Sequence, residues 1–266
     1  MEQESSINPD IEPTEKFGRD VEIHAFFIRH GEKEPSATTG ETDLTDKGRL
    51  ESRAFGQRLE LRTAIKPYTS DTARTTETAR LITEASPTEK KMQLQIKGEL
   101  GFQYSQNFIG EVRRKQQAAG EDKADEVVTD WFLSFEDKNP DMGTFSPIET
   151  AAMIARRIDI YSRMADRLNS GSNVDLVNIS HDFPIAAFLK EILVRDIDGK
   201  SVKGFSSIAE IGGPIGYNDG FEVLIHNDQV GQKQISLNLR GETCQLDQAR
   251  FNELVEFART REKEEI

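Results

Sequence analysis

Apolar segments rich in β-branched and aromatic residues alternate with helical patterns along most of the chain. Residues 21–29 and 172–180 have the composition of buried strands, and a helical pattern follows each of them. Parallel strands need crossovers of this kind, and the crossover helices cover the faces of the sheet. The sequence therefore predicts an α/β protein, a three-layer α/β/α sandwich with a mainly parallel central sheet.

The other expected elements can be given by range. Further strands are expected at 64–70, 91–100, 220–226 and 232–239, of which the last two suit a hairpin. Helices are expected at 44–62, 71–85, 124–135, 147–168, 184–194 and 247–266. Since no internal repeat and no low-complexity linker follows residue 20, we expect one domain over residues 21–266.

Local patterns predict how some of these elements begin and which faces they bury. Thr45 suits the N-cap of the first helix, and residues 146–149 form a capping box before a later helix. Three apolar residues of the first helix recur at helical spacing, namely Leu50, Ala54 and Leu59. Alternate residues of 91–100 are apolar, which is typical of a half-buried strand: Met92, Leu94 and Ile96.

Polar side chains stand where three of the expected strands end. The first strand runs into Arg29 and His30, Arg74 opens the helix after the second strand, and His181 follows residues 172–180. Because the carboxyl ends of parallel strands lie at one edge of a sheet, we expect these side chains to converge there. Arginine forks match phosphate oxygens, and a neutral imidazole can attack phosphorus. The pattern therefore predicts a pocket for a phosphoryl group.

Four motifs together make a more specific pattern. They are RHGE at 29–32, LTDKG at 44–48, SDTARTTETA at 70–79 and SH at 180–181, in that order. This set resembles the histidine phosphatase superfamily, the phosphoglycerate mutase-like group, and in particular its first branch. The resemblance extends over about residues 22 to 240, essentially the whole expected domain.

The resemblance implies a role for each site residue. His30 is expected to be the nucleophile that takes the phosphoryl group and passes it to water. Arg29, Arg74 and His181 are expected to complete the phosphate pocket and to stabilise charge on the transferring oxygens. Glu99 lies where the family keeps its general acid, which protonates the leaving alkoxide. No metal and no cofactor are expected.

Asp182 is an alternative to Glu99 as the proton donor. First-branch members usually have glycine after the second histidine, whereas the second branch places its donor in a His-Asp pair. This chain has His181 followed by Asp182, which combines features of both branches. A helix-capping role also suits Asp182, because Pro184 follows two residues later. Glu99 is the preferred donor and Asp182 the second choice.

The expected function is metal-independent hydrolysis of a phosphomonoester. A mutase-like phosphotransferase is the alternative within the family, but the characteristic Trp-Asn stretch of such mutases is missing from residues 32–43. A catalytically silent phosphate-binding module is the alternative from another class. Residues 103–145 are expected to form a helical insertion, a lid over the active site, and the glycines of 211–220 to form a turn-rich connection.

Composition limits the partners that this chain is expected to have. A net charge of −13 argues against binding to nucleic acid or to anionic membranes, so the expected partner is a small phosphorylated substrate. With Cys244 as its one cysteine, the chain cannot form an internal disulfide. Residues 1–20 are acidic and polar and are expected to be a disordered or loosely docked tail, and the protein is expected to be cytoplasmic. The identity of the substrate and the oligomeric state stay open.

Overall fold

The computed structural model describes residues 16–34 and 43–264 of the 266-residue chain. Its described strands form one nine-stranded sheet. The strands are β1 (Val21–Arg29), β2 (Ala64–Thr69), β3 (Gln95–Ile96), β4 (Asn173–Ser180), β5 (Leu193–Ile197), β6 (Lys200–Lys203), β7 (Gly220–Asn227), β8 (Lys233–Leu239) and β9 (Glu242–Leu246). The α-helices are α1 (Asp46–Arg58), α2 (Ala73–Ala85), α3 (Gln106–Ala119), α4 (Ala124–Leu133), α5 (Pro147–Ala165), α6 (Asp182–Ile192) and α7 (Gln248–Glu264).

The sheet is mixed, and the prediction of a mainly parallel sheet was wrong. The strand order is β3-β2-β4-β1-β7-β8-β9-β5-β6. Only β3, β2, β4 and β1 pair in parallel, whereas every pairing from β1–β7 onward is antiparallel. The reason is that no helix separates β5 from β6 or β7 from β8 and β9, and strands joined by tight turns must run antiparallel.

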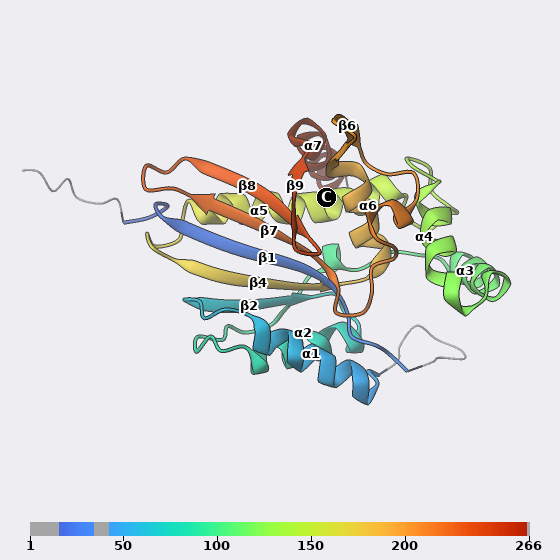
Figure 1. Cartoon of the computed structure of the whole chain (residues 1–266), viewed down its shortest axis with the longest axis horizontal. Helices are drawn as coiled ribbons and strands as arrows, with labels where there is room; N and C mark the ends of the chain where they lie inside the picture. The colour runs from blue at the N-terminus through green and yellow to red at the C-terminus, as the bar shows by residue number, and fades with distance from the viewer. Residues whose placement is uncertain (1–15, 35–42, 265–266) are drawn as a thin grey trace, which may run out of the picture.

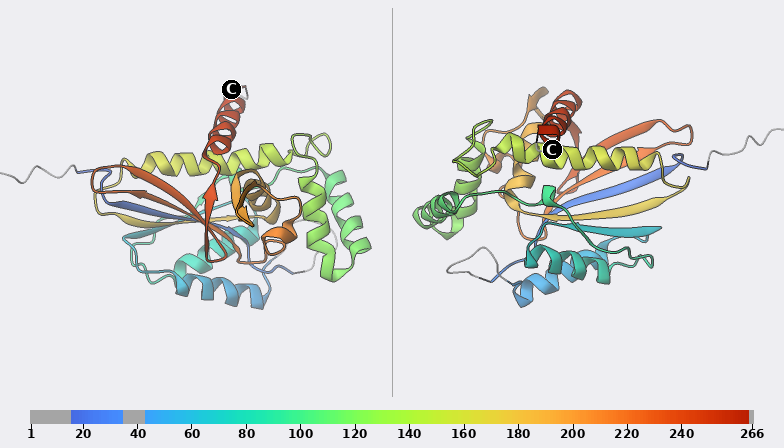
Figure 2. Two further views of the ribbon diagram at one scale, coloured as in Figure 1. Left: turned by 45° about the horizontal axis from the view of Figure 1, so that its top comes forward. Right: turned by 180° about the vertical axis from the view of Figure 1, so that it is seen from behind.

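Helices cover both faces of the parallel half of the sheet and one face of the antiparallel half (Figure 1). On one side α1 and α2 pack beneath β2 and β4, and on the other α5, α6 and α7 pack over the main core (Figure 2). In β7, Phe221, Val223 and Ile225 are buried in that core, while Glu222 and Leu224 between them stay half-exposed. The expected three layers are therefore complete only around the parallel strands.

Helix α1 begins as predicted but buries a different face. Thr45 is its N-cap, and the Thr45 side chain accepts a hydrogen bond from the Gly48 amide. Leu59, just after the helix, is buried as expected, but Leu50 is 68% exposed, and the buried residues of the helix itself are Gly48, Ser52 and Gly56. A Cβ on Gly48 would lie 2.2 Å from the Glu32 carbonyl oxygen. The helix therefore packs through its small residues, which bring its backbone close to the end of β1.

The half-buried strand predicted at 91–100 is reduced to two residues. Only Gln95 and Ile96 belong to β3, and Ile96 and Met92 are both exposed. Because β3 lies at the edge of the sheet, it has one neighbouring strand to pair with. The sequence alternation was real, but little of the structure packs against its apolar face.

Within residues 103–145, for which a helical insertion was predicted, the structure has α3 and α4, which lie together at one end of the sheet (Figure 1). The apolar residues of α4 pack inward, with Val128 and Phe132 fully buried. Aromatic rings join the insertion to the first turn of α6, since Phe108 and Phe132 both contact the ring of Phe183. This packing fixes the insertion beside the start of α6.

Most other predicted elements are confirmed. The strands at 21–29, 64–70 and 172–180, the hairpin of β7 and β8, the capping box at Ser146 and the last helix all appear. Strands β5, β6 and β9 were missed. Most of the predicted acidic tail, residues 1–15, lies outside the described residues. In the described part of the chain, no helix combines the length and the apolar composition needed to span a membrane.

Close backbone packing of α1 predicts a strong effect of Gly56→Ala. A Cβ at this position would lie 2.2 Å from the Ile82 carbonyl oxygen in α2, so one helix must move. We expect the free energy of unfolding to fall by about 2 kcal/mol or more. Gly110→Ala in α3 is the control, because its Cβ would meet nothing within 4 Å and alanine should stabilise the helix by about 0.5–1 kcal/mol. Urea denaturation of both variants tests this, and equal effects would contradict it.

Candidate active site

Three elements bring the predicted site residues to one edge of the sheet. Arg29 and His30 leave the end of β1, Arg74 lies in the first turn of α2, and His181 is the N-cap residue of α6. Parallel pairing of β1 with β4 sets Arg29 opposite Ser180, so His30 and His181 leave the sheet as neighbours. Their rings lie 5.4 Å apart. The predicted convergence of two arginines and two histidines is what the structure has.

His30 is buried and held in one orientation. Its Nδ1–H donates to the Gly31 carbonyl at 2.8 Å, and its Nε2 accepts from the Nε–H of Arg74 at 3.1 Å. Burial, the neighbouring His181 and the positive charge of Arg74 hold the pKa of His30 well below its usual range. The imidazole is therefore neutral, with its nitrogen lone pair on Nε2 facing Arg74.

His181 is held in the opposite tautomer. Its Nδ1 accepts from Nη2 of Arg74 at 3.4 Å, which leaves Nε2–H to donate to the Ser70 hydroxyl at 3.1 Å. Burial and the guanidinium of Arg74 lower the pKa of His181. Arg74 thus contacts both imidazoles and holds both of them in the neutral form.

Arg29 is a nearly buried cation with partners from three other segments. Its Nη1 donates to the Ile215 carbonyl at 2.7 Å and to Asp125 at 3.3 Å, and its Nη2 lies 3.2 Å from Asp182. The Tyr217 ring lies 4.3 Å from the guanidinium carbon. Burial acts to lower the pKa of Arg29, but the two carboxylates outweigh burial and raise it.

Positive charge in the site exceeds what its own carboxylates neutralise. Among the described residues, the buried Nε of Arg29 has no hydrogen-bond partner, so this guanidinium is not fully satisfied by the protein. The pKa of Lys33 is lowered by its burial and by the charges of Arg74 and Arg29, so this lysine adds a third cation nearby. Cations arranged around neutral imidazoles suit the binding of an anion such as phosphate.

The structure places the two candidate proton donors differently. Asp182 faces the site, since one oxygen lies against Arg29 and the other accepts from the Phe183 amide at 2.9 Å. Glu99 lies on the 3₁₀ turn η1 (Gly98–Leu100), which is joined to the site by the hydrogen bond from Ser180 to the Leu100 carbonyl. The ion pair of Glu99 is with Arg157 of α5, at 3.7 Å.

Sequence reasoning missed two residues that contact Arg29. Asp125 belongs to the insertion, where its charge looked like any other on a polar helix face. Tyr217 lies within 211–220, the glycine-containing segment that was predicted to be a turn-rich connection. That segment is indeed a connection, but it also forms a wall of the site. No local signal marks either residue, because both contacts join parts of the chain about 100 residues or more apart.

Comparison with known proteins points to one family. The family model of the histidine phosphatase superfamily (branch 1) matches residues 25–204. No curated protein matches the chain.

The chain is also similar to solved structures. Phosphoglycerate mutase from Bacillus anthracis str. Sterne is 13% identical, and the match covers 89% of this chain and 98% of that chain with a TM-score of 0.48. The mycobacterial glucosyl-3-phosphoglycerate phosphatase is 14% identical, with 86% and 98% covered and a TM-score of 0.48. The protein histidine phosphatase SixA, solved with tungstate, is 10% identical, with 84% and 96% covered and a TM-score of 0.37.

The lowered pKa values predict how acid affects stability. Because His30 and His181 take up protons more readily in the unfolded chain, stability should be lost as the pH falls below about 6.5, the ordinary histidine pKa. Between pH 7.5 and pH 5 the loss should be on the order of 2 kcal/mol for each histidine. The variant His30→Gln/His181→Gln should lose correspondingly less. Urea denaturation of both proteins at the two pH values measures this, and equal losses would contradict it.

Proposed function

The chain belongs to branch 1 of the histidine phosphatase superfamily, and from this membership we propose that it hydrolyses a phosphomonoester through a phosphohistidine on His30. The observation that carries the proposal is the state of His30. It is neutral, its Nδ1–H is bonded to the Gly31 carbonyl, and its Nε2 lies among the cations of the site. These are the requirements for an imidazole that attacks a phosphoryl group.

The first step forms a bond between Nε2 of His30 and phosphorus and breaks the bond from phosphorus to the leaving oxygen. In the structure, Nε–H of Arg74 donates to the Nε2 lone pair of His30. An entering phosphoryl group takes over this donor through its own oxygens and so frees Nε2 for attack. The charges of Arg29 and Arg74 stabilise the negative charge on the oxygens that do not leave.

The second step releases the phosphoryl group to water. Water attacks phosphorus, the bond between nitrogen and phosphorus breaks, and inorganic phosphate leaves with His30 neutral again. The negative charge of a bound phosphate dianion opposes the effect of burial, which lowers the pKa of His181, so phosphate binding favours a protonated His181. His181 then adds a further positive charge beside the transferring group.

Glu99 remains the proposed proton donor to the leaving oxygen. Its turn is joined to the strand end before His181, and Arg157 orients its side chain. Asp182 instead accepts from Arg29 and from the Phe183 amide. In our proposal Asp182 therefore orients Arg29 and leaves the proton transfer to Glu99.

The proposed reaction predicts that His30→Ala abolishes phosphate release. The assay uses p-nitrophenyl phosphate and a panel of cellular phosphomonoesters in the presence of EDTA, which should leave the wild-type rate unchanged because the reaction uses no metal. His226→Ala is the control, because this half-exposed histidine lies on β7, beside Glu22 and far along the sheet from His30.

Four results would contradict the proposal. Turnover by His30→Ala at the wild-type rate would exclude the phosphohistidine, and strong inhibition by EDTA would exclude the metal-free reaction. Absence of turnover in the wild type, together with phosphate binding, would support the silent binding module. Transfer of the phosphoryl group to a second position of a substrate, in place of its release, would support the mutase-like alternative.

Leaving groups distinguish the two candidate donors. A poor leaving group such as an alkoxide needs a proton in the transition state, whereas p-nitrophenolate does not. Glu99→Gln should therefore lower kcat/KM by about 10²-fold or more for an alkyl phosphate and much less for p-nitrophenyl phosphate. Asp182→Asn should lower kcat/KM by a similar factor for both substrates, because it removes a partner that orients Arg29. The reverse pattern would make Asp182 the donor.

A further inference from the structure

Arg240 has a backbone conformation that an arginine rarely adopts. It forms, with Gly241, the two-residue turn between β8 and β9, and both residues have positive φ, 52° and 84°. Turns of this kind favour Asn-Gly, because a side chain with a Cβ is disfavoured at positive φ. The local backbone conformation does not favour arginine at position 240. We therefore looked for contacts between the Arg240 side chain and other parts of the chain that stabilise this conformation.

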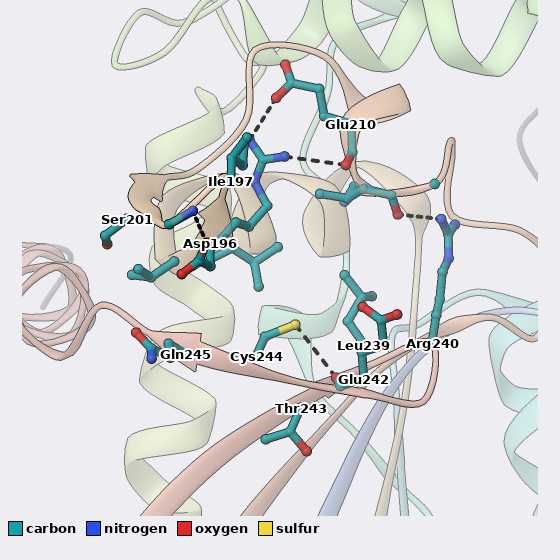
Figure 3. Close-up of a pocket in the computed structure, with 16 residues that line it drawn as sticks. Asp196, Ile197, Ser201, Glu210, Leu239, Arg240, Glu242, Thr243, Cys244 and Gln245 are labelled. Carbon is teal, nitrogen blue, oxygen red and sulfur yellow. Dashed lines mark hydrogen bonds and ion pairs between the residues drawn. The ribbon is translucent and has the colours of Figure 1, made fainter.

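Those contacts are with the backbone of the segment 211–219. Nη1 of Arg240 donates to the Ile211 carbonyl at 2.6 Å, and Nη2 donates to the Pro214 carbonyl at 2.8 Å. Nη2 also lies 3.2 Å from Asp219. Figure 3 shows the Arg240 side chain extending from its turn to this segment. A Cβ on Gly212 would lie 2.5 Å from Nη1, so glycine is needed for the contact.

The other end of the same segment holds Arg29. The Ile215 carbonyl accepts from the Arg29 guanidinium at 2.7 Å, and the ring of Tyr217 lies against it. Backbone hydrogen bonds join Asn218 and Asp219 to the main chain of Arg29, at 3.1 and 2.8 Å. A single short segment therefore contacts both arginines. Arg240 bonds to the carbonyls of its first residues and to the Asp219 side chain, whereas Arg29 contacts Ile215, Tyr217 and the backbone of residues 218–219.

We propose that Arg240 is a positioning residue that sets the orientation of the Arg29 guanidinium and so the affinity of the site for phosphate. The inference rests on the proposed function, because it takes Arg29 to be a phosphate ligand. Arg240 itself does not touch the site. It acts through the carbonyls of 211–214, which fix where Ile215 and Tyr217 meet Arg29.

Arg195 provides a matched control. It lines the same groove of about 1000 Å³ as Arg240 and also donates to backbone carbonyls, those of Gly204 and Glu210. It makes an ion pair with Glu210 at 2.7 Å, much as Arg240 does with Asp219. The residues that Arg195 holds come before Ile211 and do not include those that contact Arg29. Substitution of either arginine removes a comparable number of hydrogen bonds and one ion pair. Only the bonds of Arg240 are made to the segment that contacts Arg29.

Calorimetric titration with inorganic phosphate tests the proposal without requiring turnover. Glutamine is the substitution of choice, because it keeps part of the side-chain stem and has no β-branch to worsen the positive φ. We expect Arg240→Gln to raise the Kd for phosphate by about tenfold and Arg195→Gln to change it less than about twofold. Arg240→Lys, which keeps the charge and fewer donors, should lie between wild type and Arg240→Gln and serves if the glutamine variant does not fold.

A double-mutant cycle separates positioning from general loss of stability. If Arg240 acts through Tyr217 and its neighbours, Tyr217→Leu and Arg240→Gln together should raise the Kd by less than the product of their single effects. Three results would each overturn the proposal. They are additive effects of the two substitutions on the free energy of phosphate binding, a wild-type Kd for phosphate in Arg240→Gln, and an equal rise of the Kd in Arg195→Gln. If the wild type binds phosphate but hydrolyses no ester, the proposed function is wrong. The Kd values of the Arg240 and Arg195 variants still test the role of Arg240 in that case. A wild type that releases phosphate from esters but binds no phosphate overturns the proposed role of Arg240 in phosphate affinity and leaves the proposed function in place.

Discussion

Burial of the Arg29 guanidinium is the constraint on which the arrangement of the site depends. A charged side chain that is 6% exposed must be paired and hydrogen-bonded, since an unpaired buried charge is strongly destabilising. The partners come from three separate segments, with Asp125 from the insertion, Asp182 from the start of α6, and Ile215 and Tyr217 from the connection before β7. One side chain at the end of β1 thus contacts the three segments that surround the site.

The two halves of the mixed sheet contribute in different ways. The parallel half places Arg29, His30 and His181 side by side, because β1 and β4 end at the same edge. The antiparallel half supplies no site residue from its strands. It supports the site through Arg240, whose turn is held against the segment that contacts Arg29. On the opposite face, the small residues of α1 let this helix approach the end of β1.

Local chemistry explains which expectations held. The sequence could predict four residues at the ends of strands with a clear pattern, namely Arg29, His30, Arg74 and His181. Parallel strands end at one edge of a sheet, so their convergence could be predicted without knowing any side-chain contact. The small residues of α1 were misjudged because hydrophobic spacing pointed to Leu50, whereas close backbone approach needs Gly48 and Gly56. Strands 233–246 and 193–203 have no intervening helix, so the βα alternation seen earlier in the chain did not apply to them.

The sequence by itself determined the family, the main helices and strands before residue 192, and the identity of the arginines and histidines at the strand ends, because those signals are local or lie in contiguous motifs. Only the tertiary structure decided the mixed character of the sheet, the tautomers of the two histidines, and the directions in which Glu99 and Asp182 point. The contacts of Asp125, Tyr217 and Arg240 belong to the same group. Such contacts join residues far apart in the chain, and no local pattern encodes which buried charge or carbonyl a side chain will meet.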